Sequence, residues 1–252
     1  MSSNDLAIDP GSFRAPPRVL ILSGGLGHSF DDTTPQLAEL LEQLDPQIEV
    51  TVVGEPSELE TLSHDLLVVN ALWWRMLGDR YRDVRPEWSR TTSAITRQRI
   101  EDHLVDGGSV LAFHTAVICF DDWPRWAQIC GASWNWERSQ HPPFDPDHPV
   151  RIDLPNHPMT SGLRPFDLID EVYGFLDLAE GNEVLATANH SGVDHPVVMR
   201  RLDGEARVAV DVLGHNHRSL ESGEHRELLG RLLSWLLRLG RDSTDSGKAG
   251  SA

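Results

Sequence analysis

Short, unbroken apolar runs in the first half of the chain constrain its fold more than any other feature. Val19–Leu22 is the first of them, and Leu66–Asn70 and Ser109–Phe113 follow it. A run this short, without alternating polar residues, is typical of a strand that is buried on both faces, as in a parallel sheet. Glu49–Val53 is predicted as a further strand between the first two.

Helical patterns separate these strands. Apolar residues at i, i+3, i+4 and i+7 mark one face of a helix, and they are Leu37, Leu40, Leu41 and Leu44. Thr34 followed by Pro35 predicts the N-cap and first residue of that helix. Ser93 predicts the cap of a second helix that runs to Val105. The alternation of strand and helix indicates an α/β fold with a doubly wound, mostly parallel sheet and helices on both faces.

The second half of the chain is richer in strand patterns. The predicted strands there are Val150–Asp153, Val184–Ala188, Val197–Arg201 and Arg207–Val212. The last element, His225–Leu239, is predicted as an amphipathic helix whose broad leucine stripe packs on the core. Residues 1–17 and 241–252 are polar and rich in Ser, Gly, Asp and Pro, so we expect flexible ends around a single domain at 18–240.

The charge balance excludes two classes of partner. The chain of 252 residues has 39 acidic and 22 basic side chains, and its net charge of −17 disfavours nucleic acid and anionic membrane surfaces. We find no apolar stretch of the roughly 18 residues that a membrane span needs. Two cysteines cannot build a disulfide framework. These features predict a cytoplasmic protein that binds a small molecule, and we expect it to be a homo-oligomer.

Histidines follow three of the predicted strands. His28 comes after the first strand, His114 directly follows Ser109–Phe113, and His215 follows the strand near Val210. Ligands of open α/β sheets bind where strands end at their carboxyl edge, so these side chains are candidates for one site. Neutral imidazoles bind metals such as zinc, and imidazole also transfers protons near neutral pH. We therefore treat all three as candidate ligands of a divalent metal.

His114 and Glu171 are the leading catalytic candidates, together with His215. A strand followed by a polar residue among small neighbours, as at His114, resembles a nucleophile elbow, which projects a side chain above the sheet. Glu171 could act as a general base or complete a site of two histidines and one carboxylate. The structural alternatives stay open: His114 as a hydrogen-bonded histidine beneath a loop, and Glu171 as a half-exposed acid in a surface turn.

Aromatic residues supply the candidate substrate-binding surface. The chain has eight tryptophans but only two tyrosines, and flat indole faces suit the apolar faces of sugar rings. The predicted substrate-binding residues are His28, Trp73, Trp74, Trp123, His141 and Tyr173. The alternative is that most of the tryptophans are core residues.

An ordered set of motifs resembles the ThuA-like (trehalose utilisation) family. The segments GGLGH, LLVVNALWW, DGGSVLAFHTAV, WPRWAQICGASW, NHPMTSGL, DEVYGF and RVAVDVLGHNHR occur in the order and spacing of that family over roughly residues 18–238. The resemblance implies the flavodoxin-like fold of class I glutamine amidotransferases, with His114 in place of the amidotransferase cysteine. His215 falls where the amidotransferase histidine would lie, and His217 replaces the glutamate usually found two residues later. Leu77–Thr92 is longer than we expect of the family, so it is a candidate lid or partner surface.

The resemblance also implies a role in carbohydrate catabolism. We expect an enzyme that acts on a disaccharide or a 3-keto-glycoside by His/Glu acid–base chemistry, assisted by a divalent metal. Hydrolysis, elimination and isomerisation would all be served by the same residues. The main alternative is a non-catalytic sugar-binding or regulatory module, and a further one is an amidotransferase subunit that uses Cys119.

Overall fold

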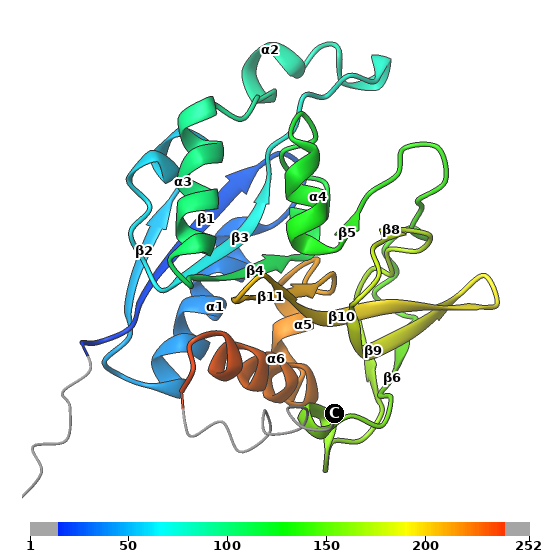
Figure 1. Ribbon diagram of the computed structural model, residues 1–252. Helices are drawn as coiled ribbons and strands as arrows, with labels where there is room; N and C mark the ends of the chain where they lie inside the picture. The colour runs from blue at the N-terminus through cyan, green and yellow to red at the C-terminus, as the bar shows by residue number, and fades with distance from the viewer. Residues whose placement is uncertain (1–14, 240–252) are drawn as a thin grey trace, which may run out of the picture.

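The computed structural model describes residues 15–239 (Figure 1). The predicted flexible ends lie outside the described residues, apart from residues 15–17, which lead into the first strand. None of the described helices combines the length and apolarity that crossing a membrane requires.

Five parallel strands form the centre of the main sheet. They are β1 (Arg18–Gly25), β2 (Glu49–Val53), β3 (Leu66–Leu72), β4 (Ser109–Phe113) and β11 (Ala206–Asp211), side by side in the order β2-β1-β3-β4-β11. Every residue of β3, β4 and β11 is buried, as the unbroken apolar runs predict.

Antiparallel strands extend this sheet beyond β11. They follow in the order β10 (Val193–Asp203), β9 (Glu183–His190), β6 (Val150–Asp153) and β7 (Phe166–Leu168). A separate two-stranded sheet pairs β5 (Ala132–Ser133) with β8 (Asp177–Leu178). The architecture is therefore α/β with a mixed sheet that is parallel at its core, and the antiparallel extension qualifies the expectation of a mostly parallel sheet.

Helices pack on both sides of the sheet. The α-helices are α1 (Phe30–Leu44), α2 (Arg85–Trp88), α3 (Ala94–Val105), α4 (Pro124–Cys130), α5 (His217–Glu221) and α6 (Gly223–Leu236), and 3₁₀ turns occur at Pro56–Thr61, Asp79–Tyr81, His114–Val117 and Pro158–Thr160. Helices α1, α5 and α6 pack together below the parallel strands in Figure 1, and α3 and α4 lie above them. Right-handed crossovers explain this, because the chain moves in opposite directions along the sheet from β1 to β2 and from β3 to β4.

The first helix begins earlier than its sequence predicts. The N–H groups of Asp32 and Thr33 both donate to the carbonyl of Ser29, so the helix starts at Phe30 and Thr34 is not its N-cap. Thr34 instead uses its hydroxyl to contact Ser23 at 2.6 Å and to accept a hydrogen bond from Asn70. The prediction failed because the side chain of Thr34 serves the strand edge rather than the helix end.

The other long helices agree closely with their predictions. Ser93 caps α3 by accepting a hydrogen bond from the N–H of Thr96, and the helix ends at Val105 as predicted. Helix α6 begins at Gly223 and ends at Leu236, so it is shifted toward the N-terminus of the predicted range. Its leucine stripe is fully buried, which confirms that the stripe belongs to the core.

Candidate functional site

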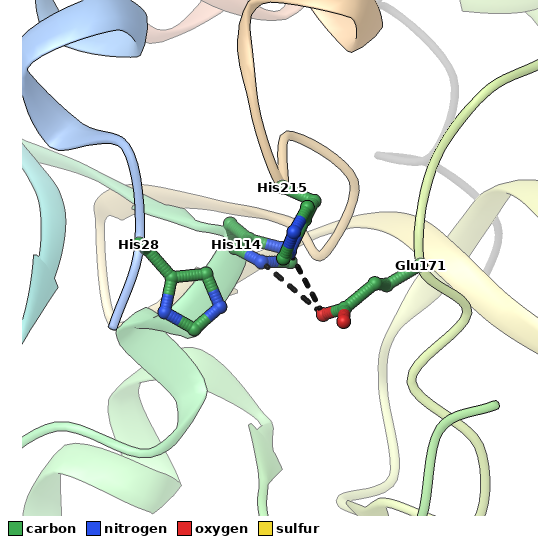
Figure 2. A group of neighbouring side chains, drawn as sticks. All are labelled: His28, His114, Glu171 and His215. Carbon is green, nitrogen blue, oxygen red and sulfur yellow. Dashed lines mark ion pairs between the residues drawn. The ribbon is translucent and has the colours of Figure 1, made fainter. Parts of the chain in front are cut away.

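Three histidines from separate loops meet at the carboxyl edge of the parallel strands. His28 lies between β1 and α1, His114 follows β4, and His215 lies between β11 and α5. The ring centroid of His28 lies 4.9 Å from that of His114 and 5.2 Å from that of His215. Glu171, from the segment between β7 and β8, joins them (Figure 2). The topology thus brings together four residues that the sequence analysis selected.

His114 is held by strained backbone and a strong hydrogen bond. Its φ of 47° lies in the left-handed region, which is unusual for a residue other than glycine and matches the expectation of an elbow after the strand. The Nδ1 atom lies 2.9 Å from the carbonyl oxygen of Val212, so Nδ1 carries the proton and donates to it. The Nε2 atom of the buried ring is therefore unprotonated, and it lies 3.8 Å from Oε2 of Glu171 and 3.4 Å from the Tyr173 hydroxyl.

The loop that carries His215 is fixed by a buried carboxylate and a glycine. Asp170 accepts hydrogen bonds from the N–H groups of Gly214 and His215, at 2.7 and 3.0 Å. Gly214 has a φ of 112°, and a Cβ at this position would lie 2.3 Å from the ring of Phe113. Only glycine lets this loop pass so close to β4.

The carboxylate of Glu171 lies at the centre of the group. Its Oε2 atom is 3.1 Å from Nδ1 of His215 and 3.8 Å from Nε2 of His114. Its Oε1 atom is 3.3 Å from Nδ1 of His141, a half-exposed residue of the loop before β6. The Glu171 side chain is 6% exposed, so the structure rules out the alternative of a half-exposed acid in a surface turn.

Three polar atoms of this group are buried and have no hydrogen-bond partner within residues 15–239. They are Nδ1 of His28, Oε2 of Glu171 and Nδ1 of His215. The contact between Glu171 and His215 has a suitable length but not the geometry of a hydrogen bond. Burying such atoms unpaired costs about 1–3 kcal/mol each. Figure 2 shows His114 and His215 turned toward the carboxylate with His28 beside them, and one ligand atom from each of the four residues lies within 4.8 Å of the others.

Burial and mutual repulsion keep two of the histidines neutral. Burial, followed by the charges of His114 and His215, lowers the pKa of His28 to about 3. Burial also lowers the pKa of His114 to about 4, although Val212 and Glu171 favour its charged form. Both imidazoles are therefore unprotonated at neutral pH, which is the form that binds a metal ion.

The pKa values of Glu171 and His215 are shifted so that each residue favours its charged form. Burial opposes ionisation of Glu171, but the contact with His215 and the charges of the neighbouring histidines leave its pKa below the ordinary value. Burial likewise opposes protonation of His215, and the contact with Glu171 outweighs it and raises the pKa of His215. The contact therefore favours the carboxylate form of Glu171 and the imidazolium form of His215.

The donor set fits a divalent metal such as zinc. Three imidazole nitrogens and one carboxylate oxygen are ligands that zinc prefers, and one such atom from each of the four residues lies within 4.8 Å of the others. The backbone hydrogen bond of His114 Nδ1 is also the outer contact that orients a metal-binding histidine. The residues present thus fit the group that the sequence analysis anticipates.

Two aromatic residues complete the surroundings of the group. The Tyr173 hydroxyl lies 3.4 Å from Nε2 of His114, and their rings lie 4.9 Å apart. Phe144 stacks on His215 with ring centroids 4.7 Å apart. Sequence reasoning included Tyr173 but missed Phe144, whose only signal is its place in the same loop as His141. It also missed Asp170, which directly precedes Glu171.

The three tryptophans proposed for substrate binding lie in different places. Trp74 and Trp123 line an aromatic pocket of about 860 Å³. Trp73 does not line it; this buried residue stacks on Trp88, and the guanidinium of Arg90 lies 4.7 Å from its ring centroid.

Two further residues, His217 and Cys119, do not take part in the cluster. His217 starts α5 half-exposed, near Asp32 and Glu221, and is not part of the cluster. Cys119 is buried, donates to the carbonyl of Ala71 and has its pKa raised by burial to about 12. Since a thiolate is the nucleophilic form, this cysteine is unsuited to amidotransferase chemistry.

The comparisons with known proteins agree with this fold. The family model described as trehalose utilisation (ThuA) matches residues 18–236. A ThuA-like protein from Parabacteroides merdae superposes with a TM-score of 0.70 at 19% identity, covering 88% of this chain and 90% of that one. A ThuA-like protein from Bacteroides uniformis gives a TM-score of 0.65 at 16% identity, covering 92% and 97%.

A larger enzyme contains the same fold. The cold-adapted β-galactosidase of Rahnella sp. R3 superposes with a TM-score of 0.59 at 14% identity, over 90% of this chain but only 32% of the galactosidase. The superpositions establish a shared fold. A search of curated protein sequences finds no match.

Proposed function

Because this chain belongs to the trehalose utilisation (ThuA) family, we propose that it is an enzyme of carbohydrate catabolism that acts on a disaccharide or a 3-keto-glycoside. The observation that carries the proposal is the cluster of His28, His114, Glu171 and His215, in which one ligand atom from each residue lies within 4.8 Å of the others. Helices on both sides of the sheet support the flavodoxin-like, doubly wound fold of class I glutamine amidotransferases as its framework.

The three histidines would hold a divalent metal such as zinc. His28 and His114 are neutral at neutral pH, and Nε2 of His114 is kept as the free nitrogen by the bond from Nδ1 to Val212. A bound zinc ion would supply a Lewis acid that polarises the keto group of the sugar. In this scheme His114 and His215 contribute to catalysis by binding and orienting the metal.

Glu171 is the proposed base. Its lowered pKa keeps it ionised, and its Oε2 atom accepts no hydrogen bond of suitable geometry from the described residues, although Nδ1 of His215 lies 3.1 Å away. A carbon next to a keto group loses its proton much more readily than an ordinary sugar carbon, and a positioned carboxylate accelerates such a transfer by about 10²–10⁴-fold. Nδ1 of His141 lies 3.3 Å from the other carboxylate oxygen, and its hydrogen-bond partner is the carbonyl oxygen of Pro142 at 2.9 Å.

Metal content and turnover can be measured on matched variants. Purified protein is analysed for bound metal by mass spectrometry and assayed with 3-keto-glucosides, with products identified by NMR. We expect Glu171→Gln to lose at least 100-fold in kcat while it keeps its metal. His28→Ala and His215→Ala should lose both metal and activity. His217→Ala is the control, because this exposed histidine lies outside the cluster, and it should keep both.

The same experiment identifies the alternatives. Loss of the metal in Glu171→Gln would show that Glu171 is a ligand rather than the base. Sugar binding without turnover in the metal-loaded wild type would contradict the enzyme and favour a binding module on this fold.

A further inference from the structure

Residues 141–149, in the loop between β5 and β6, lie against the histidine cluster. Their sequence is HPPFDPDHP, and none of the nine residues is buried. Phe144 stacks on His215 with ring centroids 4.7 Å apart and an angle of 24° between the rings. Nδ1 of His141 lies 3.3 Å from Oε1 of Glu171. An exposed segment therefore contacts two of the four cluster residues.

The hydrogen bonds of this segment are all internal. They join His141 to the carbonyl of Pro142, and Asp145 to Asp147 and His148. Within residues 15–239, no hydrogen bond joins the segment to another part of the chain. Its position on the cluster therefore depends on ring contacts and on the approach of an imidazole to a carboxylate, rather than on hydrogen bonds.

Both ends of the segment are anchored. Gln140 exchanges two backbone hydrogen bonds with Gly174, at 3.2 and 2.8 Å. At the other end, Val150 begins β6 and pairs with Leu168 of β7. Movement is therefore confined to the residues between these two anchors.

Four prolines make the segment stiff. Proline fixes its own φ and restricts the residue before it to extended backbone. In the sequence HPPFDPDHP, only Phe144 and Asp147 escape both restrictions. A stiff segment loses little conformational entropy when it settles in one place, so a few ring contacts are enough to hold it. It also moves as a unit, so His141 and Phe144 leave the cluster together.

The burial of the proposed base requires an opening. The side chain of Glu171 is 6% exposed and that of His114 is 1% exposed. A sugar carbon cannot reach the carboxylate while the surrounding residues keep these positions. The loop of His215 is held by two hydrogen bonds to Asp170. The segment before β6 has no such bonds, so it can leave the cluster at the lower cost.

The segment at 77–92, which the sequence analysis offers as a lid or a partner surface, makes its contacts elsewhere. Arg90 pairs with Glu55 at 2.7 Å, and Trp88 stacks on Trp73. Within the described part of the chain, none of its hydrogen bonds, ion pairs or ring contacts reaches the four cluster residues. The loop that reaches the cluster is the shorter, proline-rich one before β6.

We infer that residues 141–149 form a lid on the histidine cluster, which opens to admit the sugar and closes with Phe144 on His215 and His141 beside Glu171. The inference rests on the proposed function for the identity of the molecule that enters. Closing excludes water from the carboxylate and holds the ring of His215 in place. Phe144 is then a positioning residue, because it acts on the reaction through His215.

A spin label near the tip of the lid measures its movement without turnover. Asp147→Cys places one reactive thiol there, because Cys119 and Cys130 are buried and should not react. The nitroxide spectrum should contain a mobile and an immobile component. Phe144→Ala in this background should raise the ratio of mobile to immobile label about two- to tenfold, which is what one ring pair contributes. Phe144→Tyr keeps the ring and should restore the ratio. Equal spectra with and without the ring would overturn the lid.

A label on α6 is the matched control. Glu227 is exposed on this helix, so a nitroxide at Glu227→Cys should give the same spectrum with and without the ring of Phe144. A change at both labelled positions would show that Phe144→Ala loosens the whole fold, and this result would also contradict the lid.

Addition of a sugar separates this inference from the proposed function. A 3-keto-glucoside, added with zinc to the protein labelled at Asp147→Cys, should convert the mobile component into the immobile one. Turnover without this conversion would overturn the lid alone. A label that Phe144→Ala frees, in a protein that neither binds nor converts the sugar, supports the lid and overturns only the proposed chemistry.

Discussion

Replacing Asp211 with asparagine should destabilise the protein by about 3 kcal/mol while leaving its shape unchanged. Asp211 ends β11, and its Oδ2 atom lies 2.9 Å from Nε2 of His225 on α6. Both side chains are 0% exposed. The other oxygen of Asp211 accepts the N–H of Leu213, and His225 also contacts Ser219. The pair therefore anchors both ends of the segment that carries His215.

The magnitude follows from the burial of this pair. Removing one partner of a buried ion pair costs about 3–5 kcal/mol, because the remaining charge loses its compensation. An asparagine amide keeps the bond to Leu213 and can donate to a neutral imidazole, which recovers about 1 kcal/mol. The net loss is about 2–4 kcal/mol, or a fall in Tm of about 6–12 °C for a domain of this size.

The pH dependence gives a second, sharper test. Burial opposes protonation of His225, but the charge and hydrogen bond of Asp211 outweigh it, so its pKa is raised in the folded state. A raised pKa means that the folded protein holds the proton more tightly than the unfolded chain. The stability from this pair is therefore complete below the ordinary histidine pKa of about 6.5 and is lost as pH rises through the folded value.

Urea unfolding of the wild type and Asp211→Asn from pH 5 to 9 measures both effects. The difference in unfolding free energy between the two proteins should be largest at low pH and shrink as pH rises. Glu227→Gln is the control, because it breaks an exposed pair with Arg231 on the same helix and should cost about 0.5 kcal/mol or less. A constant difference across this pH range would refute the assignment of a charged His225.

Three further predictions concern the site and its supports. Gly214→Ala should lower stability by more than 2 kcal/mol and weaken metal binding, because its Cβ would lie 2.3 Å from Phe113. Gly162→Ala is the control and should cost only about 1 kcal/mol, because Gly162 has a positive φ but open space where its Cβ would lie. Equal unfolding free energies of the two variants would contradict the clash. The metal-free protein should lose stability as pH falls from about 6.5 toward 4, because the unfolded chain protonates histidines whose pKa values are depressed in the folded state. In thermal melts, His28→Gln should reduce the dependence of Tm on pH. An unchanged dependence would show that His28 is not the group responsible. Trp126→Phe should lower the unfolding free energy by about 1–2 kcal/mol, because the indole N–H donates to Ala116 within the turn that follows His114; no loss by urea unfolding would mean that this hydrogen bond adds nothing.

Much of the parallel core could be predicted from sequence because its strands are buried on both faces. In the run Ser109–Phe113 every residue after Ser109 is apolar, and the strand has these bounds in the structure. The start of α1 could not be read from Thr34 and Pro35, because their role depends on Ser23 and Asn70, which are far away in sequence. Caps are local signals only where the side chain has no better distant partner.

The four residues of the cluster could be selected from sequence as candidates, but their arrangement could not. The histidines stood out because each follows a strand, and parallel strands end at one edge. Nothing in the sequence around Glu171 indicates that its carboxylate turns inward, since this depends on Asp170 bonding the loop of His215. The pairing of strands β6, β7, β9 and β10 as an antiparallel extension likewise depends on contacts between distant segments.

The loops of the candidate site come from widely separated parts of the chain, and this affects how the protein matures. The bond from His114 to Val212 joins residues 98 positions apart, and the contact with Tyr173 spans 59 positions. Closing such long loops is slow, so the site forms late in folding. During synthesis on the ribosome, His28 and His114 emerge well before Glu171 and His215. The four side chains can therefore come together only after His215 has been synthesised.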